Sequence, residues 1–230
     1  MPTNRQIKRR ERTEAILDAA MTIVLEEGAQ TLTMRKLAKE VGLTPGAVYR
    51  YFDGKAVILA RIGQRTLGRY AEALDLRETD ARAEARQAGL TTEATALYTL
   101  LARSWHYFSL SVEDPAGWQL INLFLVSPRR IIDEDNHLRM MALFSSQLQR
   151  VAALSDHAVG VGALAPGRGL DRALVVFAAL NGHLQYLKLA HTSGLGFTPE
   201  QTVFNGLDAI LAGWGAPDDA RAAAWELLRK

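Results

Sequence analysis

The chain has 230 residues, of which 48% are hydrophobic and none is cysteine. The lack of cysteine excludes disulfides, thiolate metal sites and a cysteine nucleophile. No apolar run approaches the roughly 20 residues that a membrane-spanning helix needs, and the basic start of the chain lacks the apolar core of a signal peptide. We therefore expect a cytoplasmic protein with no membrane partner.

Charge is distributed unevenly along the chain, although the formal net charge is only +2. Residues 1–69 carry 13 Lys and Arg against 7 Asp and Glu, whereas residues 70–230 carry 14 against 18. A basic first part favours a polyanionic partner, and a merely solvated charged surface is the other interpretation.

Apolar residues recur at helical spacing in the first part of the chain, and a first helix is predicted from near Arg9 to Gly28. Thr33 is suited to cap the start of a second helix, and Gly42 lies where a tight turn must follow it. The leading stretch RQIKRRER is interpreted either as a disordered solvated tail or as an arm that contacts DNA.

A third helix is predicted to be capped by Thr44, with Pro45 at its first position, where a missing N–H costs nothing. A fourth helix is predicted from Lys55 past Tyr70, and residues 77–89 are interpreted as a loop or an exposed helical extension. Further helices are predicted over 92–112, 115–126, 132–158, 170–192, 199–214 and 217–229. Alternating strand patterns are scarce, so the predicted fold is all-α.

The third helix has two different sides on a helical wheel of about 100° per residue. Val48 and Phe52 fall together, where they can pack on Leu37 and Val41 of the second helix. The opposite side and its edges carry Gly46, Arg50, Tyr49 and Tyr51. Small residues in the first turn let a phosphate approach, and the tyrosines supply hydroxyls and flat apolar faces. These are the parts of a recognition helix in the DNA major groove.

Residues 33–59, TMRKLAKEVGLTPGAVYRYFDGKAVIL, closely resemble the helix-turn-helix of TetR-family transcriptional regulators. The resemblance lies in the Thr-x-Arg start, the Gly turn, the Val-Tyr-x-Tyr-Phe segment and the Lys that follows. It implies that Arg35 is directed to a guanine edge and that Lys55 holds a phosphate. The DNA-contacting residues implied by the resemblance are Thr33, Arg35, Thr44, Pro45, Gly46, Ala47, Tyr49, Tyr51 and Lys55.

The resemblance also implies an architecture: an N-terminal three-helix DNA-binding domain at 1–54, joined to a larger helical ligand-binding and dimerisation domain at 55–230. Residues 170–189 and 199–214 are expected to form the homodimer interface. The implied function is that of a sequence-specific repressor, released from a pseudo-palindromic operator in double-stranded DNA by a small-molecule ligand. No catalytic activity and no cofactor is expected, and the ligand-binding residues are not predicted.

Two other functions are weighed. A metal-dependent helical enzyme would use His183 and His191 and the acidic segment with Asp133, Asp135 and His137, although acids at a helix start more often complement the helix dipole. No glycine-rich phosphate loop, HExxH element or nucleophile elbow supports an enzyme. An interaction module without DNA binding would leave the groove-facing residues idle.

Overall fold

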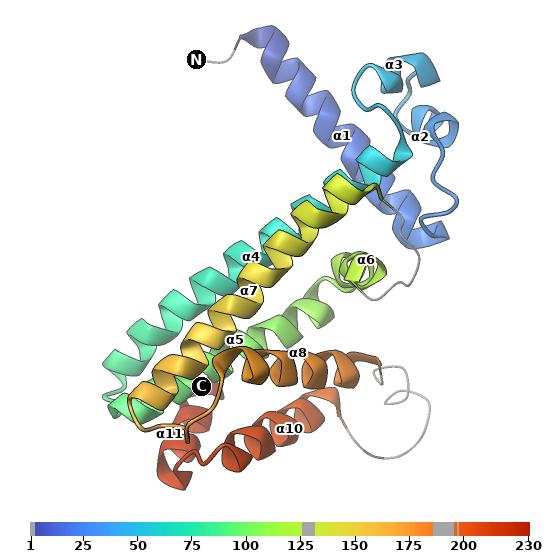
Figure 1. Cartoon of the computed structure of the whole chain (residues 1–230). Helices are drawn as coiled ribbons and strands as arrows, with labels where there is room; N and C mark the ends of the chain where they lie inside the picture. Colours follow the sequence, from blue (N-terminus) through green and yellow to red (C-terminus); the bar gives the residue numbers. More distant parts are fainter. Residues whose placement is uncertain (1–2, 126–131, 186–195, 197) are drawn as a thin grey trace. The chain divides into compact units, whose positions relative to one another are not determined.

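The computed structural model describes residues 3–125, 132–185, 196 and 198–230. Helices are the only regular secondary structure among these residues, which confirms the all-α prediction (Figure 1). None of the described helices has both the length and the apolarity that crossing a bilayer requires. The helices are α1 (Asn4–Glu27), α2 (Met34–Glu40), α3 (Pro45–Tyr49), α4 (Lys55–Gln87), α5 (Thr92–Glu113), α6 (Pro115–Leu125), α7 (Glu134–Gly160), α8 (Gly169–Gln185), α10 (Pro199–Gly213) and α11 (Asp218–Leu228).

The chain divides into two compact units. Unit 1 comprises Met1–Arg69 and Asp114–Leu143, and unit 2 comprises Tyr70–Glu113 and Phe144–Lys230. Helices α4 and α7 each contribute residues to both units. The predicted functional boundary after residue 54 falls immediately before the first residue of α4 and stays a prediction.

Helix α1 begins earlier than predicted. A capping box closes its first turn: the Thr3 hydroxyl accepts a hydrogen bond from the Gln6 N–H, and the Gln6 side chain accepts one from the Thr3 N–H at 2.7 Å. These bonds satisfy two backbone groups that a helix start otherwise leaves unpaired. The expected start near Arg9 and the disordered-tail interpretation are therefore wrong, because the stretch RQIKRRER lies within a 24-residue helix.

Unit 1 is built around one hydrophobic core. Its fully buried members include Ile16, Leu37, Val48, Ile58 and Ile62. Helix α6 also contributes to this core, through Leu120 and Phe124. Gly63 of α4 makes the close approach possible, since a Cβ atom there would lie only 2.7 Å from the Phe124 ring.

The turn between α2 and α3 follows the predicted local chemistry. Thr33 caps α2 by accepting a hydrogen bond from the Lys36 N–H at 3.1 Å, and Thr44 caps α3 by accepting one from the Ala47 N–H at 3.2 Å. Gly42 has a φ of 63°, in the left-handed region that favours glycine. The predicted N-caps and the glycine turn are confirmed.

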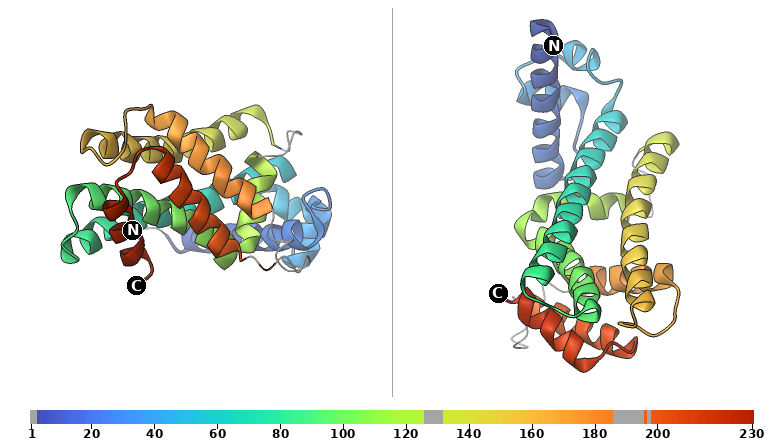
Figure 2. Two further views of the ribbon diagram at one scale, coloured as in Figure 1. Left: turned by 90° about the horizontal axis from the view of Figure 1, so that it is seen from below. Right: turned by 90° about the vertical axis from the view of Figure 1, so that its left-hand side faces the viewer.

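Unit 2 is organised around α5, most of whose residues from Ala94 to Ser104 are buried. Helix α11 packs on α5, and α8 and α10 lie side by side (Figures 1 and 2). Residues 77–87 prolong α4, so the helical alternative to a loop is confirmed, but the expected exposure is wrong in part because Glu78, Ala81 and Ala85 are buried. The predicted helix over 170–192 is present as α8, and its residues 186–192 lie outside the described residues.

Candidate nucleic-acid interface

Helix α3 packs against the core of unit 1 with one side and exposes the other side to solvent. Val48 is completely buried and Phe52 is 5% exposed, and both belong to the same core cluster as Leu37. Tyr49, between them in sequence, is 53% exposed. The predicted orientation of α3 is therefore confirmed at these positions: its apolar residues face α2, and Tyr49 faces solvent.

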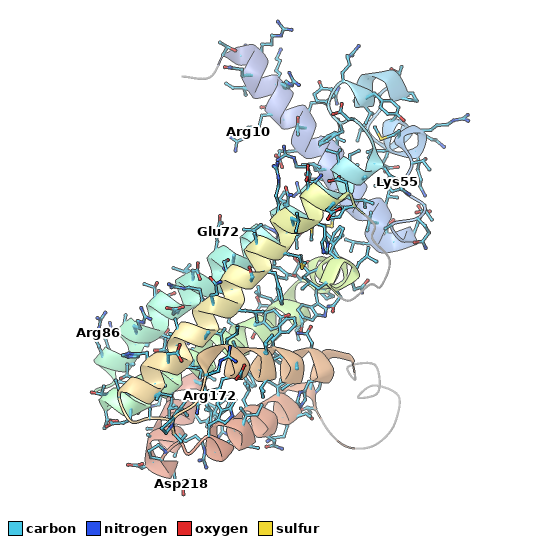
Figure 3. The ribbon with its side chains drawn as sticks, viewed as in Figure 1. Arg10, Lys55, Glu72, Arg86, Arg172 and Asp218 are labelled. Atoms are coloured by element: carbon cyan, nitrogen blue, oxygen red, sulfur yellow. The ribbon has the colours of Figure 1, made fainter. Side chains whose placement is uncertain are left out.

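The predicted contact residues come together along α2, α3 and the start of α4, but their exposure differs. Thr33, Arg35, Thr44, Pro45, Gly46 and Tyr49 are exposed, Tyr51 and Lys55 are half-buried, and Ala47 is buried. Figure 3 shows Lys55 at the first turn of α4. Because the Ala47 side chain is only 7% exposed, its contribution to the surface lies in its small size.

The two capping threonines keep a free donor. Each Oγ1 accepts a backbone N–H, from Lys36 for Thr33 and from Ala47 for Thr44. A hydroxyl that accepts one hydrogen bond can still donate its own proton. Thr33 and Thr44 can therefore hold their helix ends in place and donate to a phosphate oxygen at the same time.

Tyr51 lies differently from the wheel-based expectation. Helix α3 ends at Tyr49 with Arg50 as its C-cap, so Tyr51 belongs to the turn that follows and not to the helix. Its ring packs partly against the core cluster of unit 1. The exposed remainder of Tyr51 lines a groove together with Arg50.

Several cations of this surface have no acidic partner among the described residues. Arg35, Arg50 and Lys55 form no ion pair with any described residue, whereas the neighbouring Lys36 is paired with Glu27. Unpaired guanidinium and ammonium groups are the side chains that bind DNA phosphates and guanine edges. Three unpaired cations in the same helix-turn-helix segment as exposed Tyr49 are therefore suited to double-stranded DNA.

The basic start of α1 is not among the predicted contact residues, but it shares a groove with two residues of this surface. Arg5, Lys8, Arg9 and Arg12 line an open groove of about 760 Å³, which Asn4, Arg50 and Tyr51 complete. The spacing of three and four residues between these basic residues is a helical signal that was already present in the sequence. We call this surface the α1 groove.

The acidic segment considered for a metal site has a local structural role. The Asp133 carboxylate accepts hydrogen bonds from the side-chain and backbone N–H groups of Asn136, at 2.8 and 2.9 Å. These bonds lower the pKa of Asp133 from its usual value. In the described part of the chain, no group of three or more His, Asp or Glu residues is arranged to hold a metal ion. His191 lies outside the described residues.

Comparison with known proteins points to one family. The family model described as "Bacterial regulatory proteins, tetR family" matches residues 16–62, which contain α2 and α3. The Fatty acid metabolism regulator protein of Bacillus subtilis is 32% identical over 60 residues, which cover 26% of this chain and 31% of that protein. The HTH-type transcriptional regulator SrpR of Pseudomonas putida is 28% identical over 182 residues, covering 76% of this chain and 74% of that protein.

The fold is also shared with a solved structure. SmeT, the repressor of the Stenotrophomonas maltophilia multidrug efflux pump SmeDEF, is similar with a TM-score of 0.66 at 24% identity, over 90% of this chain and 92% of that chain. A complex of SmeT with triclosan has a TM-score of 0.64 at 23% identity, over 91% of this chain and 94% of that chain. The matched helix-turn-helix, the related regulators and the common fold lead to one conclusion: the chain carries a helix-turn-helix of the TetR family of bacterial regulatory proteins at residues 16–62.

Proposed function

We propose that the protein is a homodimeric repressor that binds a pseudo-palindromic operator in double-stranded DNA and is released from it by a small-molecule ligand. The observation that carries the proposal is the outer surface of the helix-turn-helix. Tyr49 is 53% exposed there, and Arg35, Arg50 and Lys55 of the same segment form no ion pair with any residue in the described part of the chain. Nothing in this arrangement calls for catalysis, so the proposed role is binding alone.

The residues of this surface are assigned different roles. Arg35 is assigned to a guanine edge, because a guanidinium can donate two parallel hydrogen bonds to O6 and N7. Phosphate and sugar contacts are assigned to the hydroxyls of Thr33, Thr44, Tyr49 and Tyr51 and to the Lys55 ammonium. Pro45, Gly46 and Ala47 are assigned to close approach, since their small size lets α3 enter the major groove.

A dimer would present two such surfaces to the duplex. Helix α8 leaves three large apolar side chains substantially exposed: Leu170 at 41%, Leu174 at 47% and Val175 at 45%. A two-fold symmetric contact through α8 and the adjacent α10 would bury them. Two recognition helices related by that symmetry would read two half-sites about 34–36 Å apart, which is why the operator is proposed to be pseudo-palindromic.

The ligand is proposed to act from a helical domain at 55–230, joined to a DNA-binding domain at 1–54. The triclosan complex of SmeT supports a ligand-binding role for this fold. Release requires that the ligand bind the DNA-incompetent state better than the competent one. By linkage, operator DNA must then weaken ligand binding by the same factor.

Selection of binding sites from a pool of random duplexes tests the proposal, followed by fluorescence anisotropy on the selected duplex. The full-length protein should enrich a two-fold symmetric sequence and bind it with strong salt dependence. Arg35→Gln should lose discrimination at one position of each half-site, by about 1–3 kcal/mol for a bidentate contact. Arg86→Gln, an exposed position of α4 in unit 2, is the matched control. Failure to enrich any sequence would refute operator recognition.

A further inference from the structure

Helix α1 carries a basic sector and an acidic sector on different sides of the helix. At about 100° per residue, Arg5, Lys8, Arg9 and Arg12 fall within a sector of about 100°, and Glu11, Glu14 and Asp18 fall in another sector. The acidic sector is partly neutralised, since Arg65 contacts Glu14 at 3.0 Å and Asp18 at 2.8 Å. The basic sector has no such partner in the part of the chain that the structure describes.

The basic sector lines the α1 groove together with Arg50 and Tyr51. None of its cations, nor Arg50, forms an ion pair with a described residue. Five cations around one groove of about 760 Å³ repel one another unless an anion lies among them. The groove is therefore electrostatically suited to a polyanion and has no acid of its own on its lining.

The position of the groove identifies the polyanion. Arg50 is the C-cap of α3 and Tyr51 follows it directly, so the α1 groove is continuous with the surface proposed to enter the major groove. A duplex bound there would bring its own backbone to the α1 groove. Arginine supplies most of the lining cations, and its planar guanidinium suits phosphate oxygens.

Helix α1 fixes the relative positions of the cations that line the α1 groove before DNA binds. The capping box of Thr3 and Gln6 closes the first turn, and Lys8 and Arg12 lie one turn apart on the same helix. Side chains on a formed helix lose less conformational freedom on binding than those on a disordered arm. This differs from a flexible arm, which would have to become ordered on the DNA.

We propose that the α1 groove is a second DNA-binding element, which binds backbone phosphates flanking the half-site read by α3. The inference rests on the proposed operator binding and adds a sequence-independent contribution to it. Because phosphates carry no sequence information, the α1 groove lengthens the contacted duplex and raises affinity without changing the recognised bases.

The test compares two double variants of the full-length protein with equal charge. Arg9→Gln/Arg12→Gln removes two lining cations, and Arg10→Gln/Arg86→Gln removes two exposed cations that do not line the groove. Figure 3 shows Arg10 projecting from α1 away from α2 and α3. Glutamine keeps the helix propensity close to that of arginine, and thermal unfolding checks that both variants fold alike.

Affinity is measured by fluorescence anisotropy at several salt concentrations. Two subunits lose four phosphate contacts in Arg9→Gln/Arg12→Gln, so the slope of log K against log salt should become shallower by about 3.6. Between 50 and 200 mM salt, the wild type should therefore lose about 100-fold more DNA affinity than the variant loses. The control variant should keep the wild-type slope.

Duplex length gives a second readout. Wild type should bind a selected operator with about one further helical turn at each end, 10 bp, more tightly than one cut at the outer edges of its half-sites. Arg9→Gln/Arg12→Gln should show a clearly smaller difference between the two duplexes, because three of the five lining cations remain. An unchanged slope and length dependence in that variant, or equal slope losses in both variants, would overturn the proposal. An acidic protein as the true partner would give the first of these outcomes.

Failure of this inference is distinguishable from failure of operator recognition. A duplex of random sequence is measured in parallel, because the α1 groove should contribute the same salt slope to specific and non-specific binding. If the wild type selects no operator, but Arg9→Gln/Arg12→Gln still makes the slope of log K against log salt shallower on random duplex, then phosphate binding by the α1 groove stands and operator recognition fails. If the wild type selects an operator, but Arg9→Gln/Arg12→Gln leaves the salt slope unchanged, then operator recognition stands and the α1 groove is not a phosphate-binding element.

Discussion

The guanidinium of Arg103 lies 3.1 Å from the carboxylate of Glu78, and both side chains are only 2% exposed. Arg103 also donates to Asp75 at 2.9 Å and to the side chain of Gln147. Glu78 in turn accepts a hydrogen bond from Arg150 at 3.0 Å. The charges at the centre of unit 2 are thus paired with each other, and further polar partners complete their hydrogen bonding.

Removing one partner of the Arg103–Glu78 ion pair should lower the free energy of unfolding substantially. Arg103→Met leaves the Glu78 carboxylate buried without one of its positively charged partners. Removal of one partner of a buried ion pair typically costs about 3–5 kcal/mol of stability. The free energy of unfolding from urea titration measures the loss. Arg65→Met, which removes the partly exposed pairs with Glu14 and Asp18, should cost about 1 kcal/mol or less. Similar losses in both variants would contradict the role assigned to burial.

Two glycines of α4 should respond oppositely to alanine. At Gly63 a new Cβ would meet the Phe124 ring at 2.7 Å and the Met140 methyl at 3.2 Å, so Gly63→Ala should destabilise the protein by about 1–3 kcal/mol. At Gly68 nothing lies within 4 Å, so Gly68→Ala should stabilise it by about 1 kcal/mol through helix propensity. Thermal unfolding compares the two, and adding Phe124→Leu should partly rescue Gly63→Ala.

Tyr49 and Phe52 should separate DNA binding from stability. Phe52 is 5% exposed, and Phe52→Ala should cost about 3–5 kcal/mol of core packing. Tyr49 is 53% exposed, so Tyr49→Ala should leave thermal unfolding nearly unchanged while weakening operator binding in anisotropy. Equal thermal destabilisation by the two substitutions would mean that the side of α3 facing DNA is wrongly assigned.

A charge on α8 should prevent dimerisation. Leu174→Lys places an ammonium group within the proposed apolar interface, so the protein should sediment as a monomer at micromolar concentration and lose operator binding. Leu76→Lys is the matched control, because Leu76 of α4 is 63% exposed and lies outside that interface. A dimeric Leu174→Lys protein with normal operator affinity would refute an interface through α8.

The Glu84 carboxylate should make the stability of unit 2 depend on pH in the acidic range. Burial raises its pKa, but hydrogen bonds from Tyr98 and Arg77 outweigh burial and leave the pKa lowered from 4.5. The folded state therefore binds the proton less readily than the unfolded state does. This contribution to stability is present above pH 4.5 and is lost as pH falls through the folded pKa. Tyr98→Phe should reduce the dependence, as urea titrations across that range would measure.

Local signals account for the part of the site that sequence predicted well. Thr33 and Thr44 are N-caps, and Gly42 is the turn residue, because each conformation depends on a few neighbouring atoms. The Thr3 and Gln6 capping box at the start of α1 is an equally local signal, but the dense positive charge that follows it favours a disordered tail or a DNA-contacting arm when the sequence is considered alone. The contact roles of the predicted DNA-binding residues stay predictions.

The other differences between expectation and structure depend on helix ends and on packing between helices, which the spacing of apolar residues in the sequence does not predict. A helical wheel cannot predict the position of Tyr51, because α3 ends at Tyr49. Ala81 and Ala85 are buried in a segment without large apolar residues, so its hydrophobicity gave no sign of packing. The pair of Arg103 and Glu78 joins residues 25 positions apart and depends on how helices pack in three dimensions.

The aromatic packing of α11 gives the protein a built-in optical reporter. Trp225 is 5% exposed, its ring lies 6.1 Å from that of Trp105, and its indole N–H donates to Asp208 at 2.9 Å. Of the four tryptophans, Trp118 is in unit 1, and the other three are in unit 2. Intrinsic fluorescence of Trp118→Phe therefore follows unit 2 alone, and a protein that keeps only Trp118 follows unit 1. The two units can thus be observed separately during unfolding without an attached dye.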